Sequence, residues 1–311
     1  MKEKKLNGRC LYTPGGAARE YAAVGCNFYR GCPYQCRYCY NRRGLTAKVM
    51  GLDHAVLEDV FVKAERRPKK YRELTAEEYA YVCFQQEVFK WQDYLRKTGI
   101  FFSFSTDPLC DAAFDLTWLC VRHATKEYGI PVKILTKNAD FSAFQMLQFD
   151  MTSPDQRSLI AFGYTLTGRD DWEPYASKNS DRVRMLRIFH DMGFKTFASI
   201  EPIVDFGSSL SMIKQSARFC DQFLIGLMSC RKANGLEPYT KDDGSRFVSN
   251  VDSFFLVFND SRPDKHFTHI YWKESIRQLV MSRMFAKMVI DYSPESVSRD
   301  WSLFTKSEIK L

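Results

Sequence analysis

Three closely spaced cysteines have the clearest capacity for chemistry in this sequence. Cys32, Cys36 and Cys39 follow one another with the spacing C-x₃-C-x₂-C. Short intervals in a loop let three thiolates converge on one face of an iron–sulfur cubane, and thiolates are the soft ligands that such clusters require. Ferredoxin-type runs supply four cysteines and close the cluster, whereas three leave one iron open. The spacing therefore predicts a [4Fe–4S] cluster with a free coordination position.

A zinc site is the rival interpretation of these cysteines. Zinc sites commonly join a C-x₂₋₄-C pair to a distant pair of cysteines or histidines, and Cys220 and Cys230 are later thiols that could complete one. A zinc knuckle would not account for the β/α pattern described next, so we favour the iron–sulfur cluster. Cys26 also lies near the loop, but as a fourth ligand it would block the open iron, and we interpret it as a buried thiol.

Short β-rich runs alternate with helical patterns, which predicts a parallel sheet. The expected strands are 21–24, 100–104, 132–135, 159–166, 195–200 and 222–227, with 267–272 as a candidate seventh. Amphipathic or helical patterns cover 76–97, 115–128, 180–192 and 208–220. Six β/α repeats predict an α/β fold, a partial (β/α)6 barrel that is open on one side. In such a fold functional groups belong at the carboxyl ends of the strands.

The chain divides into three expected parts. Residues 1–20 read as a loose N-terminal leader, residues 21–230 as the partial barrel, and residues 231–311 as a C-terminal extension entered through a polar, turn-rich segment.

The composition and net charge of the chain indicate which classes of protein and partner are expected. With 45% hydrophobic and 26% charged residues, the chain has the composition of a soluble globular protein. No apolar run approaches a membrane span and the basic N-terminus leads into no signal core, so we expect a cytoplasmic protein with no membrane partner. The 10 cysteines are then expected to bind metal or stay reduced. A net charge of +8 favours polyanionic partners such as nucleic acid, although many basic proteins bind none.

The cysteine loop resembles the signature of the radical S-adenosylmethionine (radical SAM) superfamily, in which an aromatic residue follows the same cysteine spacing. Other short elements resemble, in order, the spore photoproduct lyase-like (DNA repair photolyase-like) branch of that superfamily. They are Asn27–Cys32, Ser105–Pro108, Leu135–Asn138, Thr165–Thr167, and Glu173-Pro174 with Asp181-Arg182. The resemblance covers about residues 20–230. The cysteine loop is highly specific, and the other matches persuade only as an ordered series.

The resemblance implies a definite set of cofactors. A [4Fe–4S] cluster would bind the amino and carboxylate groups of S-adenosylmethionine at its unique iron. One electron, from an external flavodoxin- or ferredoxin-like reductant, would cleave the sulfonium to methionine and a 5′-deoxyadenosyl radical, which abstracts a hydrogen atom from a substrate. The cofactors carry that chemistry, and the protein supplies positioning and a water-poor cavity.

Polar residues at the ends of the middle strands are the expected cofactor contacts. Thr106, Asp107, Lys137 and Thr165 each fall at the carboxyl end of a predicted strand. Asp107 suits an ammonium and Lys137 a carboxylate, so together they could clamp the methionine end of the cofactor. The alternatives are a helix cap for Asp107 and an exposed lysine for Lys137.

The later strands end in a second polar group. Ser199 and Glu201 could face the ribose hydroxyls of the cofactor, since a carboxylate accepts paired O–H bonds. The alternative is a solvated loop carboxylate. The segment 271–274 (Tyr-Trp-Lys-Glu) could close the pocket, or could pack with two surface charges.

The candidate hydrogen-transfer residues are less defined. The resemblance places Tyr38 and Tyr40 near the cofactor, where tyrosines can take part in hydrogen transfer, and the alternative is that they shield the cluster from solvent. Spore photoproduct lyases carry a hydrogen-donating cysteine where this chain has Phe104. Cys110, or Cys83, could substitute, the alternative being buried structural thiols. Phe104 argues against repair of a thymine dimer.

Three substrate classes remain. The net charge, Arg42-Arg43, the basic run 66–70 and the aromatics Tyr71, Tyr79 and Tyr81 favour an enzyme that acts on nucleic acid as a lyase or base-modifying enzyme, although such a run can also be a solvated helix face. The second class is a radical SAM enzyme that modifies a peptide or small molecule. The third is a non-enzymatic zinc or iron–sulfur binding module.

Overall fold

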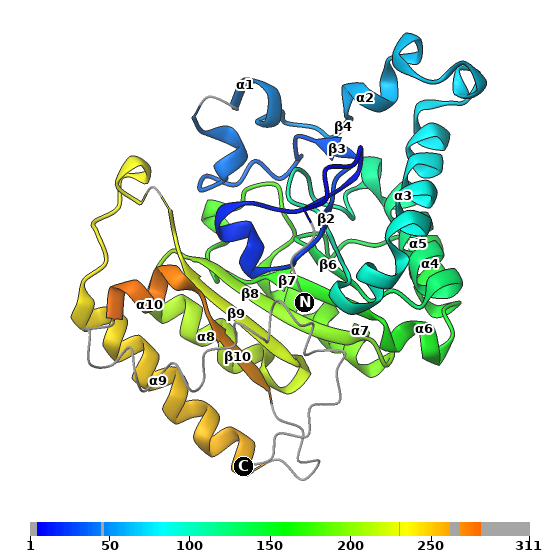
Figure 1. The fold of residues 1–311 in the computed structure, drawn as a ribbon. Coiled ribbons are helices and arrows are strands. Elements are labelled where there is room, and N and C mark those ends of the chain that lie inside the picture. Colours follow the sequence, from blue (N-terminus) through cyan, green and yellow to red (C-terminus); the bar gives the residue numbers. More distant parts are fainter. Residues whose placement is uncertain (1–4, 45–46, 230, 262–267, 281–311) are drawn as a thin grey trace.

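The computed structural model describes residues 5–44, 47–229, 231–261 and 268–280. Its main sheet has eight strands, and all but the first run parallel to their neighbours (Figure 1). In spatial order the strands are β1 (Leu11–Tyr12), β2 (Gly25–Cys26), β5 (Ile100–Phe102), β6 (Val132–Thr136), β7 (Ile160–Thr165), β8 (Lys195–Ile203), β9 (Gln222–Leu227) and β10 (His269–Trp272). No pairing within the described residues joins β10 back to β1. The sheet is therefore an open, partial barrel, and the candidate seventh parallel strand, β10, is confirmed.

Helices connect the parallel strands and pack on the outer face of the sheet (Figure 1). They are α3 (Ala76–Thr98), α4 (Asp111–Tyr128), α5 (Ala143–Asp150), α6 (Pro154–Ser158), α7 (Asn179–Asp191), α8 (Phe206–Ser216), α9 (Lys241–Asp260) and α10 (Glu274–Val280). The shorter α1 (Ala47–Met50) and α2 (Asp59–Val62) flank β4 (Val56–Leu57), which pairs with β3 (Tyr29–Arg30). The helices predicted over 76–97, 115–128, 180–192 and 208–220 are confirmed, with boundaries shifted by a few residues.

Alternation along the strands divides the apolar side chains into two cores. Outward side chains such as Phe102 and Phe162 join the helices in the main core. Inward side chains form a second cluster, comprising Tyr21, Ala22, Phe101, Ala161, Phe197, Leu224 and Tyr271. At Gly163, on the inner face, any Cβ would overlap the ring of Phe197. The barrel interior is thus filled by side chains below its mouth.

The described part of the expected leader, residues 5–20, packs on the barrel. Leu11–Tyr12 pairs with β2, and the carboxylate of Glu87 on α3 accepts the backbone N–H of Arg9 (2.6 Å) and of Leu11 (2.8 Å). A carboxylate that receives several N–H donors fixes a segment that has little secondary structure of its own. For residues 5–20 the expectation of a loose segment was therefore wrong, and residues 1–4 lie outside the described residues.

The first predicted strand was placed too early. Gly25–Cys26 forms β2, whereas Tyr21 lies in the inner cluster and follows the 3₁₀ turn Gly16–Glu20. The β-rich run 21–24 is instead the approach to the strand, and its tyrosine fills the barrel.

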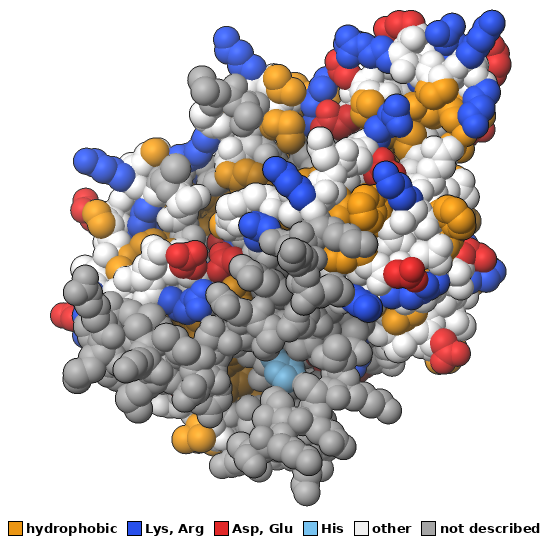
Figure 2. All heavy atoms as spheres, in the orientation of Figure 1, with side chains coloured by type: hydrophobic (Ala, Val, Ile, Leu, Met, Phe, Trp, Pro, Cys, Tyr) orange, Lys and Arg blue, Asp and Glu red, His pale blue; other side chains and the backbone are white. Residues whose placement is uncertain are grey.

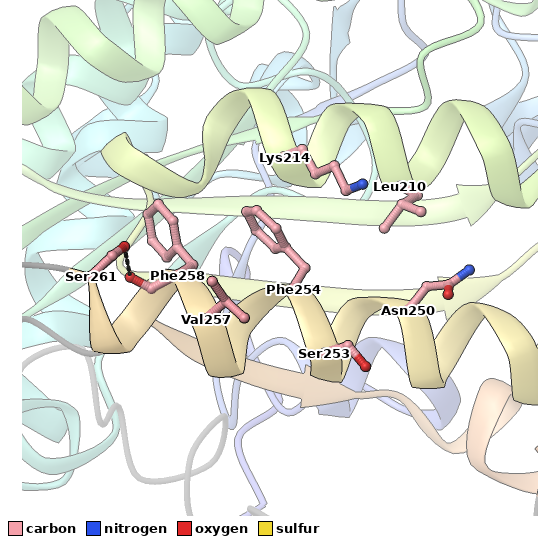
Figure 3. Close-up of a pocket in the computed structure, with 8 residues that line it drawn as sticks. All are labelled: Leu210, Lys214, Asn250, Ser253, Phe254, Val257, Phe258 and Ser261. Carbon is pink, nitrogen blue, oxygen red and sulfur yellow. Dashed lines mark hydrogen bonds between the residues drawn. The ribbon is translucent and has the colours of Figure 1, made fainter.

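The C-terminal part packs against the last strands. α9 lies beside α8, and an open groove of about 550 Å³ runs between the two helices (Figure 3). Phe254, Phe258 and Leu210 line it, and no residue of the cysteine loop does. Within the described ranges no helix is both long and apolar enough to span a membrane.

Candidate functional site

The cysteine loop follows β2 and the short strand β3, and it is shaped by two residues with positive φ. Gly31 has φ +79°, and a Cβ there would overlap the carbonyl oxygen of His54, so this position requires glycine. Gln35, between the first two cysteines, also has a positive φ (46°). The backbone of the loop is thus bent tightly at the entry to Cys32 and again before Cys36.

Backbone hydrogen bonds hold each cysteine of the loop. The N–H of Cys32 donates to Leu52 O (3.1 Å), and the N–H of Cys39 to Cys36 O (3.0 Å). Between them, Arg37 N–H donates to the carbonyl of Trp172 (2.9 Å), which lies beyond the end of β7. The loop is therefore fixed both internally and to the neighbouring strand end.

The three thiols fit a cluster better than a single metal ion. Cys32 and Cys39 are half-buried and Cys36 is buried. No three Cys, His, Asp or Glu side chains in the described ranges converge where one ion could bind. A cubane places its thiolates on separate iron atoms, so convergence on one point is not required of them. Zinc ligands must share one ion, and a zinc site would need a fourth ligand besides these three cysteines.

The structure does not place the later thiols, Cys220 and Cys230, as further zinc ligands beside the cysteine loop. Cys220 is buried at the start of β9, at the opposite end of the parallel sheet from the cysteine loop. Cys230 lies outside the described residues.

The local charges act on the thiols in opposing directions. Burial raises the pKa of Cys32, and the carboxylate of Asp107 raises it further. Burial also raises the pKa of Cys36, whereas the ammonium of Lys137 lowers it. Because iron binds thiolates, loading the site releases protons, and Lys137 is the described cation that favours this release at both cysteines.

Asp107 joins the ends of two strands. Its Oδ1 accepts from the Thr136 hydroxyl (2.6 Å) and from Leu109 N–H (3.0 Å), and its Oδ2 accepts from Lys137 N–H (2.7 Å). A carboxylate has about four lone-pair sites, so these bonds leave room for one more donor, on Oδ2. The alternative of a helix cap is not found, because Cys110 occupies the N-cap of α4 and no side chain caps it. Asp107 positions the backbone of Lys137.

Lys137 and Thr106 have polar atoms without nitrogen or oxygen partners among the described residues. In the described part of the chain the Nζ of Lys137 forms no hydrogen bond or ion pair, and it lies 5.7 Å from the ring centroid of Tyr38. Lys137 is half-buried, so the alternative of an exposed lysine is wrong. Among the described residues, the buried Oγ1 of Thr106 has no nitrogen or oxygen partner, and the thiol of Cys110 lies near it. Buried polar atoms are rarely left unpaired, so both groups point to a ligand.

A buried ion pair lies behind the cysteine loop. Arg182 and Glu173 are 2.8 Å apart, and both side chains are 0% exposed. The hydroxyl of Tyr38 donates to Glu173, and Arg182 also donates to the carbonyl of Thr165 (2.8 Å). Thr165 itself is buried at the end of β7. In the sequence, Glu173 and Arg182 stood out only through the family resemblance. Nothing in the sequence indicated that Tyr38 would bond to Glu173.

The other candidate hydrogen-transfer residues lie at the edge of the site or in the core. Tyr40 is 59% exposed, and its hydroxyl donates to the carbonyl of Phe104. Cys110 is buried in the main core, where burial and the nearby Asp107 raise the pKa of its thiol to about 12. Cys83 is buried in the same core. These positions agree with the alternatives of a covering tyrosine and structural thiols.

Ser199 and Glu201 belong to a closed group of side chains. The hydroxyl of Tyr21 lies 2.6 Å from both Ser199 Oγ and Glu201 Oε2. The Nζ of Lys273 lies 2.6 Å from the same Oε2 and 3.5 Å from Glu20. The solvated carboxylate and the surface charge at Lys273 are therefore wrong. No spacing in the sequence could have paired Tyr21 or Lys273 with the end of β8, because the pairing depends on how the barrel closes.

The basic run 66–70 is only partly exposed on the protein surface. Arg67 is 5% exposed, and its guanidinium donates to the carbonyls of Phe61 and Leu74, both at 2.5 Å. It lies 5.1 Å over the ring of Tyr79, which is 2% exposed. Figure 2 shows basic and acidic side chains mixed over the segment between α2 and α3 that carries this run. The interleaved aromatic and basic contact surface expected here was wrong for Arg67 and Tyr79.

Comparisons with known proteins give partial matches. No family model matches the sequence, and no curated protein does so significantly. Structures of Streptococcus suis SuiB match it when bound to S-adenosylmethionine (TM-score 0.45, 11% identity, 78% of this chain and 48% of SuiB) and when bound to the precursor peptide SuiA (0.49, 10%, 88% and 53%). The chain thus spans about half the length of SuiB. Similarities of this size do not assign a family, and neither structure is a spore photoproduct lyase.

Proposed function

We propose that this protein is a radical SAM enzyme, with a [4Fe–4S] cluster on Cys32, Cys36 and Cys39 and S-adenosylmethionine at the adjoining mouth of the barrel. One observation carries the proposal. A three-thiol loop lies at the carboxyl end of an open parallel sheet, beside an ammonium and a buried hydroxyl that have no described nitrogen or oxygen partners. The donor set suits a cluster with an open iron, and the two unpartnered groups suit an anionic, hydrogen-bonding ligand.

The chain's own residues have separate tasks in this site. When bound, the cluster and S-adenosylmethionine supply one-electron cleavage to a 5′-deoxyadenosyl radical. Lys137 offers an ammonium to a carboxylate, and Thr106 a hydroxyl. Asp107 holds the ends of β5 and β6 in place, and Oδ2 can accept from an ammonium. The packed aromatic rings of Phe101 and Phe104, 4.4 Å apart, exclude water below the mouth.

The substrate class that the described residues favour is a peptide or small molecule, the second of the classes left open by the sequence. The argument for nucleic acid depended on a surface of interleaved basic and aromatic side chains. Arg67 and Tyr79 are core residues, so that surface loses its most specific members. What remains is a net charge that many proteins share, and Phe104 stands where a repair lyase would need a thiol.

Anaerobic reconstitution tests the cofactor assignment. We expect a brown protein with about four iron and four sulfide per chain, which on reduction cleaves S-adenosylmethionine to 5′-deoxyadenosine. Cys36→Ala should lose most of the iron. Cys220→Ala, a buried thiol at the far end of the sheet, is the matched control and should keep it. A colourless protein that binds one zinc would refute the assignment.

Two measurements address the substrate class. Fluorescence anisotropy with single- and double-stranded DNA should give weak binding that Lys69→Glu/Lys70→Glu hardly changes. A steep salt dependence that this variant abolishes would instead favour a nucleic-acid substrate. Deuterium transfer from labelled peptides or metabolites into 5′-deoxyadenosine would then identify the compound that loses hydrogen.

A further inference from the structure

The ammonium of Lys137 lies over the ring of Tyr38. The Nζ is 5.7 Å from the ring centroid, a distance at which a cation is attracted to the face of an aromatic ring. The backbone N–H of Lys137 donates to Asp107 (2.7 Å), which fixes the start of the side chain. The carbons that follow are flexible, and within the described residues no hydrogen bond or ion pair holds the ammonium at their end. The tyrosine ring is therefore the described contact that sets where the ammonium lies.

Tyr38 is fixed through both its hydroxyl and its ring. The hydroxyl donates to Oε1 of Glu173. The ring packs against a small cluster of buried apolar side chains, which consists of Trp172, Val204 and Met228. A swing of the tyrosine away from the ammonium would break the hydrogen bond and lose this packing. The ring thus has a defined place beside the cysteine loop.

Glu173 is a rigid anchor for the tyrosine. Its other oxygen, Oε2, accepts from Arg182 (2.8 Å), from the hydroxyl of Thr167 (3.0 Å) and from the side-chain amide of Asn179 (3.3 Å). The residue is 2% exposed. A buried carboxylate with three donors on one oxygen keeps its position, which leaves Oε1 for Tyr38. These contacts tie the tyrosine, and with it the ammonium over its ring, to the end of β7 and the start of α7.

We propose that Glu173 and Tyr38 are positioning residues, which through the tyrosine ring aim the ammonium of Lys137 at the carboxylate of S-adenosylmethionine. The inference rests on the proposed function, because it requires the cofactor at the barrel mouth. Binding is favoured because the long lysine side chain is already ordered before the ligand arrives. The hydroxyl is essential to this role, since the ring alone has no bond to Glu173.

Two conservative variants and two ligands test the proposal. Tyr38→Phe keeps the ring and removes its bond to Glu173. Tyr271→Phe is the matched control, because the Tyr271 hydroxyl also donates to a carboxylate, that of Glu20 (3.3 Å), at the other group of strand ends. Equilibrium dialysis with the reconstituted protein would measure the dissociation constants of S-adenosylmethionine and of decarboxylated S-adenosylmethionine, which lacks the group assigned to Lys137. Iron content and the urea midpoint report whether cluster and fold are intact.

We expect Tyr38→Phe to weaken S-adenosylmethionine binding about three- to tenfold, the cost of ordering one long side chain on binding. Binding of the decarboxylated ligand should stay within about twofold, because the lysine ammonium has no partner on it. In a Lys137→Met background, adding Tyr38→Phe should change either dissociation constant less than about twofold, since residues that act through one another are not additive. Tyr271→Phe should stay within about twofold for both ligands.

A second variant keeps the test decisive. Glu173→Asp retains the negative charge beside Arg182 but withdraws it from Tyr38, and should weaken S-adenosylmethionine binding as Tyr38→Phe does. Equal losses for the two ligands, or the same loss in the Lys137→Met background, would overturn the positioning role and leave the proposed function standing. Loss of iron in both Tyr38→Phe and Glu173→Asp would also overturn it, and would assign these residues to holding the loop. A parent protein that binds no cluster would overturn the proposed function as well.

Discussion

The carboxyl ends of β5–β7 and those of β8–β10 carry similar polar side chains, but the bonding around them differs. Beside the cysteine loop, Lys137 and Thr106 have polar atoms with no described nitrogen or oxygen partner. At the other strand ends, Glu201 receives both Tyr21 and Lys273 within 2.6 Å. Two expected cofactor contacts, Ser199 and Glu201, are thus already bonded to side chains of this chain.

The difference separates a site that is prepared for a ligand from one that stabilises the fold. Unpaired polar atoms inside a protein cost free energy, so their presence in a folded chain points to a partner from outside. Polar atoms that already have partners in the chain, such as Ser199 Oγ and Glu201 Oε2, have no such need. We therefore expect substitutions beside the cysteine loop to change cofactor affinity, and substitutions beside β8 to change stability.

The largest effect should come from the ion pair behind the cysteine loop. Arg182→Met removes one partner of a pair whose side chains are 0% exposed, and leaves the charge of Glu173 buried. We expect the free energy of unfolding in urea to fall by about 3–5 kcal/mol. Glu173→Gln added to Arg182→Met should restore part of the loss. An unchanged urea midpoint for Arg182→Met would show that the loop does not depend on this pair.

Lys137→Met should weaken S-adenosylmethionine binding without a large change in stability. The lost charge-assisted hydrogen bond is worth about 1.5–3 kcal/mol, or about 10–100-fold in the dissociation constant measured by equilibrium dialysis with the reconstituted protein. Glu201→Gln is the comparison and should stay within about twofold of the parent. Equal loss in both variants would mean that both groups of strand ends contact the cofactor, and the distinction between them would fail.

The features that could be predicted from the sequence are those set by residues close together in the chain. The cysteine spacing and the alternation of strand and helix patterns depend on neighbouring residues, and they placed the loop, β5–β10 and the helices α3, α4, α7 and α8. They missed α9 (Lys241–Asp260), because its polar, turn-rich composition was interpreted as a connecting segment. Glu201 and Lys273 were each read as surface charges in one of their two interpretations, because their pairing joins residues on different strands across the open barrel. The same limit applied to Tyr21, whose partner Ser199 lies 178 positions away in the chain. Arg67 was misread because its partners are backbone carbonyls, which carry no mark in the sequence.

The second polar group should respond in stability. Glu201→Leu leaves the buried ammonium of Lys273 with only Glu20, 3.5 Å away, among described carboxylates. We expect a loss of about 2 kcal/mol in the free energy of unfolding, since a charged hydrogen bond is broken at a partly exposed carboxylate. Glu274→Gln, at the exposed neighbouring residue, is the matched control and should change stability by less than about 0.5 kcal/mol. A loss of the same size in both variants would contradict a specific role for Glu201.

The smallest effect concerns pH and compares the base of the barrel with its mouth. Lys133 and Lys137 come from β6 and the residue after it, and alternation places both on the inner face. Burial lowers the pKa of Lys133 from 10.5 to about 7, although its ammonium bonds Gln222 (3.3 Å). The pKa of Lys137 is raised, because the attraction of Cys36 and Glu173 outweighs its burial.

The sign of the pH effect follows from these pKa values. Between about pH 7 and pH 10.5 the unfolded chain keeps a proton on Lys133 that the folded chain has released, so stability rises with pH. The rise should be on the order of 1 kcal/mol from pH 7 to pH 8. Urea unfolding of the parent and of Lys133→Met at both pH values isolates this contribution, because every other titrating group is shared. Parallel changes in the two proteins would show that Lys133 keeps its ordinary pKa, and that the base of the barrel is wetter than its packing indicates.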